Sequence, residues 1–240
     1  MSKSADRFEV PLYTVSEAAR YLSVPTSTFS GWAHGYVRQA TEGRNLVSGD
    51  AVVTALPVLV KGEASIPFVG LAEGLVLAAI RKAGVPLQRI RPALARLSEQ
   101  VGLEHALASK HLYTDGAEIL YDYAERQGDT PEARSARQLV VVRKNQYVFN
   151  EIIDQYLKRV AFGPDGYVQL ICLPQYREAE VVVDPRRGFG QPTFSRGGAR
   201  LEDVLGAFRA GEPLQVVSEE YGVPPAELED ALRVATRVAA

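Results

Sequence analysis

Short hydroxyl side chains cluster in one segment near the N-terminus. They are Thr26, Ser27, Thr28 and Ser30, and they directly follow Pro25. On a helix that enters the major groove of DNA, hydroxyl groups can reach phosphate oxygens and base edges. Basic residues on either side of the segment would add phosphate contacts, and these are Arg20, Arg38 and Arg44. The chemistry predicted for this segment is therefore nucleic-acid recognition.

A second set of reactive groups lies in a loop rich in glycine and arginine, Asp184–Gly198. Its arginines, Arg186, Arg187 and Arg196, carry guanidinium groups that pair with carboxylates in a planar, two-bond geometry. An extended, glycine-rich backbone is able to enter a cleft. Two alternatives remain open, since these arginines could also be solvated or bind phosphate beside the N-terminal segment.

Catalytic and metal-binding patterns are weak. His34, His105 and His111 are widely spaced, and they form no metal-ligand pattern with the lone cysteine, Cys172. The glycines around Gly188 lack the spacing and the lysine of a phosphate-binding loop. The sequence therefore predicts a protein that is not an enzyme and that binds neither a metal nor a cofactor.

Composition is that of a folded cytosolic protein with an uneven charge distribution. The chain has 240 residues, a net charge of −2 and a pI near 6.0. No apolar run reaches the roughly 18 residues needed to span a bilayer, and the N-terminal residues lack the apolar core of a secretory signal. Five basic residues and no acid lie within residues 81–96, whereas residues 200–240 carry four arginines against eight acids. DNA binding would therefore depend on a local basic surface near the N-terminus.

Two short helices joined by a tight turn are predicted over Tyr13–Tyr36. Thr14 and Glu17 have the spacing of a capping box, in which each side chain bonds the backbone of the other residue. Pro25 suits the first position of the second helix, and Gly35 suits its end. This pattern predicts a helix-turn-helix.

The remaining elements are predicted from apolar periodicity and from turn residues. A hairpin is expected over Arg44–Thr54, with its turn at Ser48–Asp50. The other expected helices are Leu71–Ala83, Pro86–Val101, Asn150–Val160, Leu201–Ala210, Pro213–Tyr221 and a last helix from Pro224 to the terminus. The expected strands are Leu139–Arg143, Tyr167–Leu173 and Glu180–Val183, and the polar segment Gln127–Ala136 is the expected linker.

The N-terminal segment YTVSEAARYLSVPTSTF resembles the DNA-binding start of MerR-like winged-helix regulators. The later segment AIRKAGVPLQRIRPAL is similar to the helix pair that follows the wing in that family. The resemblance implies a recognition helix over Pro25–Trp32. The chain departs from the family at Ser27 and Ser30, because arginine is common at those positions in MerR-like proteins and makes a stronger phosphate contact.

The C-terminal segment resembles the small helical domain of antitoxins in VapBC-type toxin–antitoxin pairs. The glycine- and proline-rich lead-in, the segment GEPLQVVSEEYGV and the acidic helix after it carry this likeness. The resemblance implies repression of the protein's own operon and a PIN-like ribonuclease toxin as the partner. The clustered carboxylates of such a toxin would form the negative pocket that Arg186, Arg187 and Arg196 enter. The last helix fits a protein contact better than a DNA contact, because Glu227, Glu229 and Asp230 would repel phosphates there.

These patterns together predict a mainly helical α+β protein. The expected parts are a winged helix-turn-helix domain at 1–126, a linker at 127–138, and a dimerisation and toxin-binding domain at 139–240 with its helical antitoxin unit at about 180–240. The chain would act as a homodimer on operator DNA, since helix-turn-helix motifs read paired half-sites; its strands Leu139–Val142 and Val181–Val183 could pair across a two-fold axis. Two other functions stay open: a stand-alone MerR-like regulator, and an interaction scaffold without DNA binding.

Overall fold

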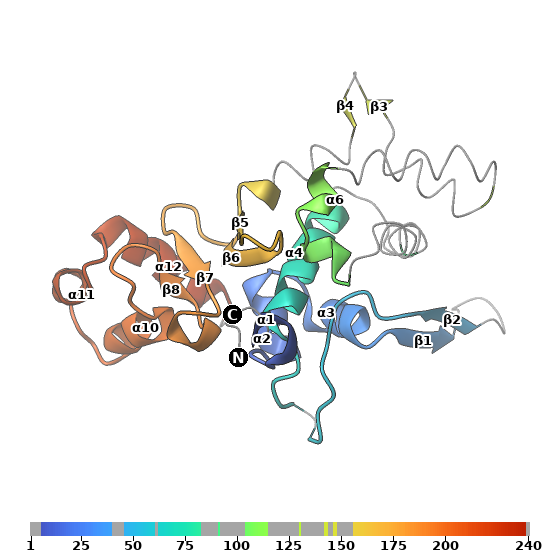
Figure 1. Ribbon diagram of the computed structural model, residues 1–240. Coiled ribbons are helices and arrows are strands. Elements are labelled where there is room, and N and C mark those ends of the chain that lie inside the picture. Colours follow the sequence, from blue (N-terminus) through green and yellow to red (C-terminus); the bar gives the residue numbers. More distant parts are fainter. Residues whose placement is uncertain are drawn as a thin grey trace.

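Helices and small antiparallel sheets alternate along the chain, which confirms the predicted α+β class (Figure 1). The computed structural model describes residues 6–39, 46–60, 62–82, 104–114 and 156–238, with residues 91, 130, 142–143 and 146–147. Most of the predicted helix Pro86–Val101 and of the linker Gln127–Ala136 lies outside these residues, as does Arg44.

The helices among the described residues are α1 (Asp6–Glu9), α2 (Val15–Tyr21), α3 (Thr26–Ala33), α4 (Phe68–Lys82), α6 (His111–Thr114), α10 (Leu201–Arg209), α11 (Leu214–Tyr221) and α12 (Pro225–Val238). Two short 3-10 helices are η1 (Ala106–Ala108) and η2 (Gly188–Gly190). The strands are β1 (Tyr36–Gln39), β2 (Leu46–Gly49), β3 (Val142–Arg143), β4 (Gln146–Tyr147), β5 (Val160–Phe162), β6 (Val168–Cys172), β7 (Val181–Val183) and β8 (Thr193–Phe194). No helix in the described part of the chain is long and apolar enough to cross a membrane.

A two-stranded hairpin follows α3 and extends away from the body of the protein, on the side opposite the C-terminal helices (Figure 1). Tyr36 lies opposite Gly49, and Gln39 lies opposite Leu46. The predicted turn at Ser48–Asp50 is therefore wrong, because Ser48 and Gly49 belong to β2. A Cβ at position 49 would lie 2.9 Å from Cε1 of Tyr36, so the glycine makes room for that ring instead of forming a turn.

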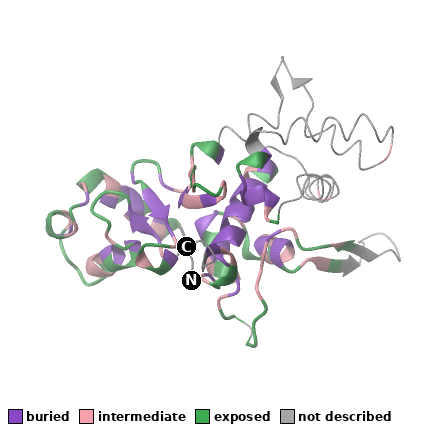
Figure 2. Ribbon diagram, in the orientation of Figure 1, coloured by how far each residue is buried: buried purple, intermediate pink, exposed green. Residues whose placement is uncertain are grey.

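Helix α4 is the central element, and its buried faces are visible in Figure 2. It begins at Phe68, three residues before the predicted start at Leu71, and Phe68, Leu71 and Leu77 are fully buried. Gly74 lets α3 approach closely, since a Cβ there would lie 2.6 Å from Cε2 of Phe29. A helix that is apolar on nearly all sides must be surrounded by other elements.

A four-stranded antiparallel sheet with the order β5-β6-β7-β8 covers the other side of the core. Strand β7 is paired on both sides, so the prediction that Val181–Val183 offers a free edge to a second copy is wrong. The predicted helix Asn150–Val160 also ends earlier than expected: Tyr156 and Leu157 are helical, but Val160 begins β5.

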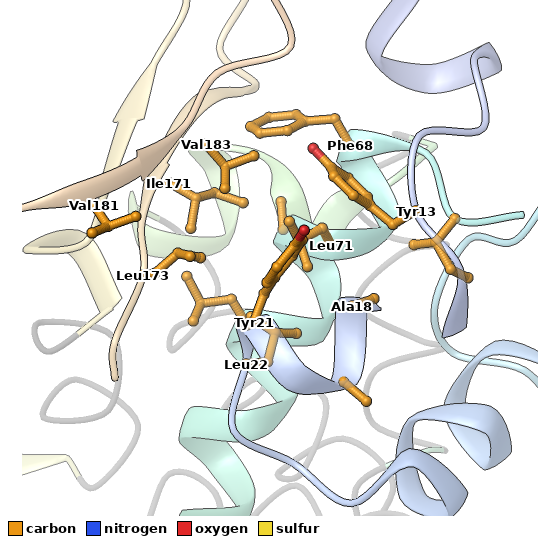
Figure 3. Packing of buried hydrophobic residues seen from close by; sticks show 14 of the residues in the cluster. Tyr13, Ala18, Tyr21, Leu22, Phe68, Leu71, Ile171, Leu173, Val181 and Val183 are labelled. Atoms are coloured by element: carbon orange, nitrogen blue, oxygen red, sulfur yellow. The ribbon is translucent and has the colours of Figure 1, made fainter. Parts of the chain in front are cut away.

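One hydrophobic core joins the N-terminal helices to this sheet. Figure 3 shows Tyr13, Leu71 and Phe68 on one side of the core, with Ile171 and Val183 on the other. The rings of Tyr13 and Tyr21 meet edge to face with their centroids 5.8 Å apart. Burial of large aromatic side chains at this junction stabilises the two parts of the chain together.

Three helices complete the C-terminal part and confirm the helical unit predicted there. Pro213 is the residue before α11 and not its first residue, and Gly222 ends α11 in a left-handed conformation with φ of 64°. Val217, Leu228 and Ala231 carry the apolar faces of α11 and α12 into the common core.

Candidate nucleic-acid interface

Helix α2 begins with the capping box that the sequence predicts. The backbone N–H of Thr14 donates to Oε2 of Glu17 at 2.8 Å, and the N–H of Glu17 donates to Oγ1 of Thr14 at 3.1 Å. Both bonds satisfy donors that helix geometry leaves without partners. Ala18 and Ala19 are fully buried, so the cap fixes the direction in which α2 enters the core.

A tight turn joins α2 to α3. Ser23 adopts the left-handed conformation with φ of 55°, and the N–H of Val24 donates to the carbonyl of Ala19 at 3.0 Å. Pro25 caps α3 and Thr26 is its first residue, so the helix begins one position later than predicted. Gly35 has φ of 70° and ends the motif, as predicted.

Helix α3 has a buried face and a hydroxyl-bearing face. Phe29 and Trp32 pack into the core, which confirms Trp32 as a packing residue. Thr26 and Ser27 are exposed, whereas Thr28 and Ser30 are half-buried. The exposed start of such a helix is the part that meets base edges and phosphates in helix-turn-helix complexes.

Arg81 contacts α3, although it was not among the residues predicted for this interface from the sequence. Its Nη1 donates to Oγ1 of Thr28 at 2.8 Å, so α4 is bonded to α3 through a guanidinium group. The basic run at residues 81–96 was visible in the sequence. Its contact with Thr28 was not, because 53 residues separate the two positions.

The basic residues predicted to support DNA binding lie on different elements. Arg20 is an exposed residue of α2, and its guanidinium lies 5.3 Å from the ring centroid of Tyr21. Arg38 belongs to β1 of the β1–β2 hairpin, which is the wing of the helix-turn-helix, and its backbone pairs with Val47. Arg44 lies outside the described residues. The structure thus places two of the three on the helix-turn-helix and its wing.

Arg91 supports the base of the wing. Its Nη2 donates to the carbonyl of Gly31 at 3.2 Å, and its guanidinium lies 5.2 Å from the ring centroid of Tyr36. Burial lowers the pKa of Arg91, and Tyr36 and Asp50 oppose that change. This arginine therefore ties the end of α3 to the first strand of the wing.

The loop Asp184–Gly198 is more structured than the sequence predicts, because it contains η2 and β8. Burial would raise the pKa of Asp184, but hydrogen bonds from the side chain and backbone of Arg186 outweigh it and lower that pKa. The guanidinium of Arg186 forms two of these bonds, at 3.0 and 2.9 Å. Arg186 is thus already paired within the chain, while the Arg187 side chain is 74% exposed.

Phe189 lies at the tip of this loop with 89% of its surface exposed. Its φ is 54°, and Gly188 and Gly190 on either side also have positive φ. The hydroxyl of Tyr13 donates to the carbonyl of Gly190 at 2.8 Å and fixes the loop to the N-terminal part. A left-handed conformation is costly for an aromatic residue, and such strain is concentrated at functional sites.

Of the three acidic residues predicted on the outer face of the last helix, two are buried or nearly buried. Asp230 is 4% exposed, and its Oδ2 accepts hydrogen bonds from the backbone N–H groups of residues 177, 178 and 179. The Glu227 side chain is 12% exposed and lies 3.7 Å from Nε of Arg196. Only Glu229 faces solvent, so the expected outward placement of Asp230 and Glu227 is wrong.

The candidate metal ligands remain apart. Among the described residues, no group of three histidine, cysteine or acidic side chains could hold a metal ion. Nδ1 of His105 lies 3.2 Å from Oε1 of Glu73 and 2.9 Å from Oγ1 of Thr54, in a cluster that links α4 to the loop before it.

These features define a winged helix-turn-helix protein whose DNA-reading part shares its core with a C-terminal sheet and three-helix unit. Residues 11–94 match a family model described as "Putative DNA-binding HTH domain". Residues 181–235 match a family described as a protein of unknown function, DUF433.

Relatives over nearly the whole chain come from Mycobacterium tuberculosis. The chain is 52% identical to "Putative antitoxin VapB45" over 94% of each chain, and 26% identical to the uncharacterized protein Rv2308 over 92% of this chain and 88% of that one. The X-ray crystal structure of Rv2018 matches with a TM-score of 0.79 and 49% identity, covering 94% of this chain and 99% of that chain. The chain belongs to the family of VapB45-type antitoxins with an N-terminal helix-turn-helix.

Proposed function

We propose that this protein is an antitoxin that neutralises a PIN-like ribonuclease and represses its own operon as a homodimer. The observation that carries the proposal is the presence of two exposed contact elements on one continuous core. The first is the start of α3, and the second is the strained tip of the loop Asp184–Gly198. Membership of the VapB45-type family supports the antitoxin role.

DNA binding is assigned to the exposed hydroxyl face of α3. Thr26 and Ser27 are exposed there, Ser30 lies on the same helix, and Arg20 adds a positive charge from α2. The chain has a net charge of −2, so a phosphate backbone must be held by this local surface. The hydroxyl of Thr28 serves instead to join α3 to Arg81.

Gel shifts with the protein's own promoter fragment test this assignment. Point variants suit the test better than deletion of the N-terminus, because Tyr13, Phe29 and Trp32 belong to the common core. Ser27→Glu places a negative charge against phosphate and should weaken binding about tenfold or more, and Arg20→Ala should lower the salt slope by about one unit. The matched control is Ser195→Glu, at an exposed serine of the C-terminal part. Equal binding by Ser27→Glu and the control would remove α3 from the interface.

Toxin contact is assigned to the loop tip, with Arg187 and Phe189 as its leading residues. A PIN-like nuclease presents clustered carboxylates, and an arginine with an unoccupied planar face can pair with them. Arg187 has this freedom, since its Nε is 4.0 Å from Asp184, while Arg186 forms a two-bond pair with the same carboxylate. Exposed aromatic side chains held rigidly are the usual anchors of protein interfaces.

RNA cleavage by the purified cognate ribonuclease tests the loop. Arg187→Ala and Phe189→Ala should each raise the antitoxin concentration needed for half-inhibition about tenfold or more. Arg186→Ala should have a smaller effect, and Arg196 is expected to contribute through its exposed guanidinium. Arg237→Ala, at the exposed end of α12, is the control. Full inhibition by the Arg187→Ala and Phe189→Ala double variant would exclude the loop from the mechanism.

Dimerisation is proposed because one helix-turn-helix makes few base contacts, and two half-sites about one DNA turn apart are usually read by a dimer. The end strands of the four-stranded sheet are β5 and β8, but the backbone of residues 199–201 already bonds the outer side of β8. Strand β5 therefore replaces β7 as the strand proposed to pair with a second copy. Light scattering should give a protein component of twice the chain mass of 26.2 kDa in the complex with the promoter fragment, after the mass of the DNA is subtracted. A monomer mass both alone and on DNA would refute this part of the proposal.

A further inference from the structure

A cavity of about 760 Å³ opens beside the helix-turn-helix. The turn between α2 and α3 forms one wall, the last turns of α4 form a second, and residues from Tyr156 to Pro174 form the third. This volume falls within the range of small-molecule sites in proteins. The cavity shares Arg81 with the candidate interface, through the bond of that residue to Thr28, but none of the residues proposed to contact DNA or toxin directly lines it.

The lining combines an apolar wall with a basic rim. Leu22, Val24, Leu75, Ala78 and Ala79 supply aliphatic surface. The charged lining residues are Arg81, Lys82, Lys158 and Arg159, and no carboxylate is among the described residues that line the cavity. A chain with a net charge of −2 thus concentrates four cations around one apolar recess.

The thiol of Cys172 also lines the cavity and adds no negative charge to it. Burial raises the pKa of the Cys172 thiol, while Arg159 acts to lower it. The thiol is therefore neutral near pH 7, and Cys172 adds soft apolar surface instead of an anion. Arg159 also donates to the carbonyl of Leu173 at 3.4 Å, which holds its guanidinium near the mouth.

We propose that this cavity binds an organic anion with an apolar body and a carboxylate or phosphate head, and that its occupancy changes DNA binding. The body would lie on the aliphatic wall, and the head would pair with the basic rim. A DNA phosphate could meet the same cations, but it has no apolar part to fill the recess. Amphipathic ligands match both surfaces at once.

The link to DNA runs through two features of the cavity wall. Residues 22–25 form the turn that sets the direction of α3. Arg81 lines the cavity and also donates to Oγ1 of Thr28 on α3. An anion that draws the Arg81 guanidinium toward the cavity removes this bond, so the ligand and the recognition helix compete for one side chain.

Calorimetric titration of the full-length protein tests the binding step without DNA. The probes are octanoate and octyl phosphate, with 1-octanol as the uncharged match. At least one of the anions should bind about tenfold or more tightly than the alcohol, which corresponds to about 1.4 kcal/mol from the charged head. Octanol binding as tightly as both anions, or no heat from either anion, would overturn the proposal.

Variants locate the site. The double variant Lys82→Gln and Lys158→Gln removes two exposed cations of the rim and should weaken anion binding about tenfold. Lys110→Gln removes an exposed lysine outside the cavity and should leave binding unchanged. Ala78→Trp should block the cavity with all charges retained, and its fold can be checked by circular dichroism. Anion binding that survives both cavity variants would place the ligand elsewhere and refute the assignment.

The effect of the ligand on promoter affinity rests on the proposed DNA-binding function and is measured in a separate experiment. Octanoate should change the promoter affinity of the unmodified protein several-fold, and this ratio should fall to one in the Lys82→Gln and Lys158→Gln variant. Octanoate that binds the protein but leaves promoter affinity unchanged would overturn the coupling. One further outcome would overturn the proposal: the parent protein binds no anion, and the variant fails to bind the promoter in octanoate-free buffer. The basic rim would then be a DNA contact. A protein that binds octanoate but no promoter DNA would contradict the proposed function and leave the cavity assignment standing.

Discussion

Asp230 offers the sharpest test of how the C-terminal unit is held. Its Oδ2 accepts hydrogen bonds from the backbone N–H groups of Arg177, Glu178 and Ala179 at 2.7, 2.9 and 3.1 Å. The carboxylate thereby joins α12 to the loop between β6 and β7. Replacing Asp230 with alanine leaves three N–H donors facing an empty space at a buried position.

The loss of stability expected on replacing Asp230 is large for a residue of a single surface helix. A hydrogen bond to a charged group contributes about 1.5 to 3 kcal/mol, but three donors share one oxygen and their contributions do not add. We therefore expect Asp230→Ala to lower the free energy of unfolding by about 3 kcal/mol. Asp230→Asn keeps a neutral acceptor and should lower it by about 1 kcal/mol.

The pH dependence follows from the direction of the pKa shift. Burial opposes ionisation of Asp230, yet the three backbone donors outweigh it and lower the pKa below its ordinary value of 3.8. The stabilisation is therefore fully present above that value and is lost as the pH falls through the lower pKa of the folded protein. The difference in stability between the parent protein and Asp230→Asn should shrink as the pH is lowered below 4.

Urea unfolding monitored by Trp32 fluorescence measures these effects. Trp32 is the only tryptophan, and it lies in α3, far along the chain from Asp230. Because both ends of the chain share one core, the Trp32 transition should still move to lower urea. The control is Glu229→Ala, whose side chain is 57% exposed. The proposed role of Asp230 is refuted if Asp230→Ala is no more destabilising than this control. A shared core is refuted if the Trp32 transition stays in place while circular dichroism shows a separate, earlier transition.

Three further substitutions test the N-terminal packing by thermal unfolding. Gly74→Ala forces a methyl group against Phe29 and should cost about 1 to 3 kcal/mol; an unchanged Tm would mean that α3 and α4 separate easily. Thr14→Ala removes the capping box and should lower the free energy of unfolding by about 1 kcal/mol. A smaller effect of Glu17→Ala agrees with the capping box, whereas no effect of either substitution would contradict it. Tyr13→Phe leaves the buried carbonyl of Gly190 without its donor and should cost about 1 to 2 kcal/mol; a Tm equal to that of the parent would show that the contact is not stabilising.

Local signals allowed much of the helix-turn-helix to be predicted. The Thr14 and Glu17 pair, the break before Pro25 and the glycine at position 35 each act within a few residues, so the sequence alone specifies them. The same holds for α10 and α11, which end shortly before Gly211 and at Gly222. Elements fixed by neighbouring residues are the ones that a single sequence reveals.

Some positions could not be predicted, because contacts between distant parts of the chain decide their structure. Gly49 has the appearance of a turn residue, but its position is decided by the ring of Tyr36 across the hairpin. Asp230 has the appearance of a solvated acid, but it caps a loop about 50 residues earlier in the chain. The contact between Arg81 and Thr28 is of the same kind. In each case the deciding partner is distant in sequence, so no local pattern marks it.

The common core also constrains how this family can change during evolution. Tyr13, Tyr21 and Leu71 meet Leu173, Val181 and Val183 across a single packed surface (Figure 3). Close-packed side chains tolerate volume changes only when their neighbours change with them. We therefore expect recombination that joins the N-terminal half of one relative to the C-terminal half of another to give poorly folded chimaeras. Under the function proposed above, such a protein inherits its DNA preference and its partner preference together. A lineage that acquires a new toxin would then change the exposed residues of the loop Asp184–Gly198, while the core beneath them stays packed.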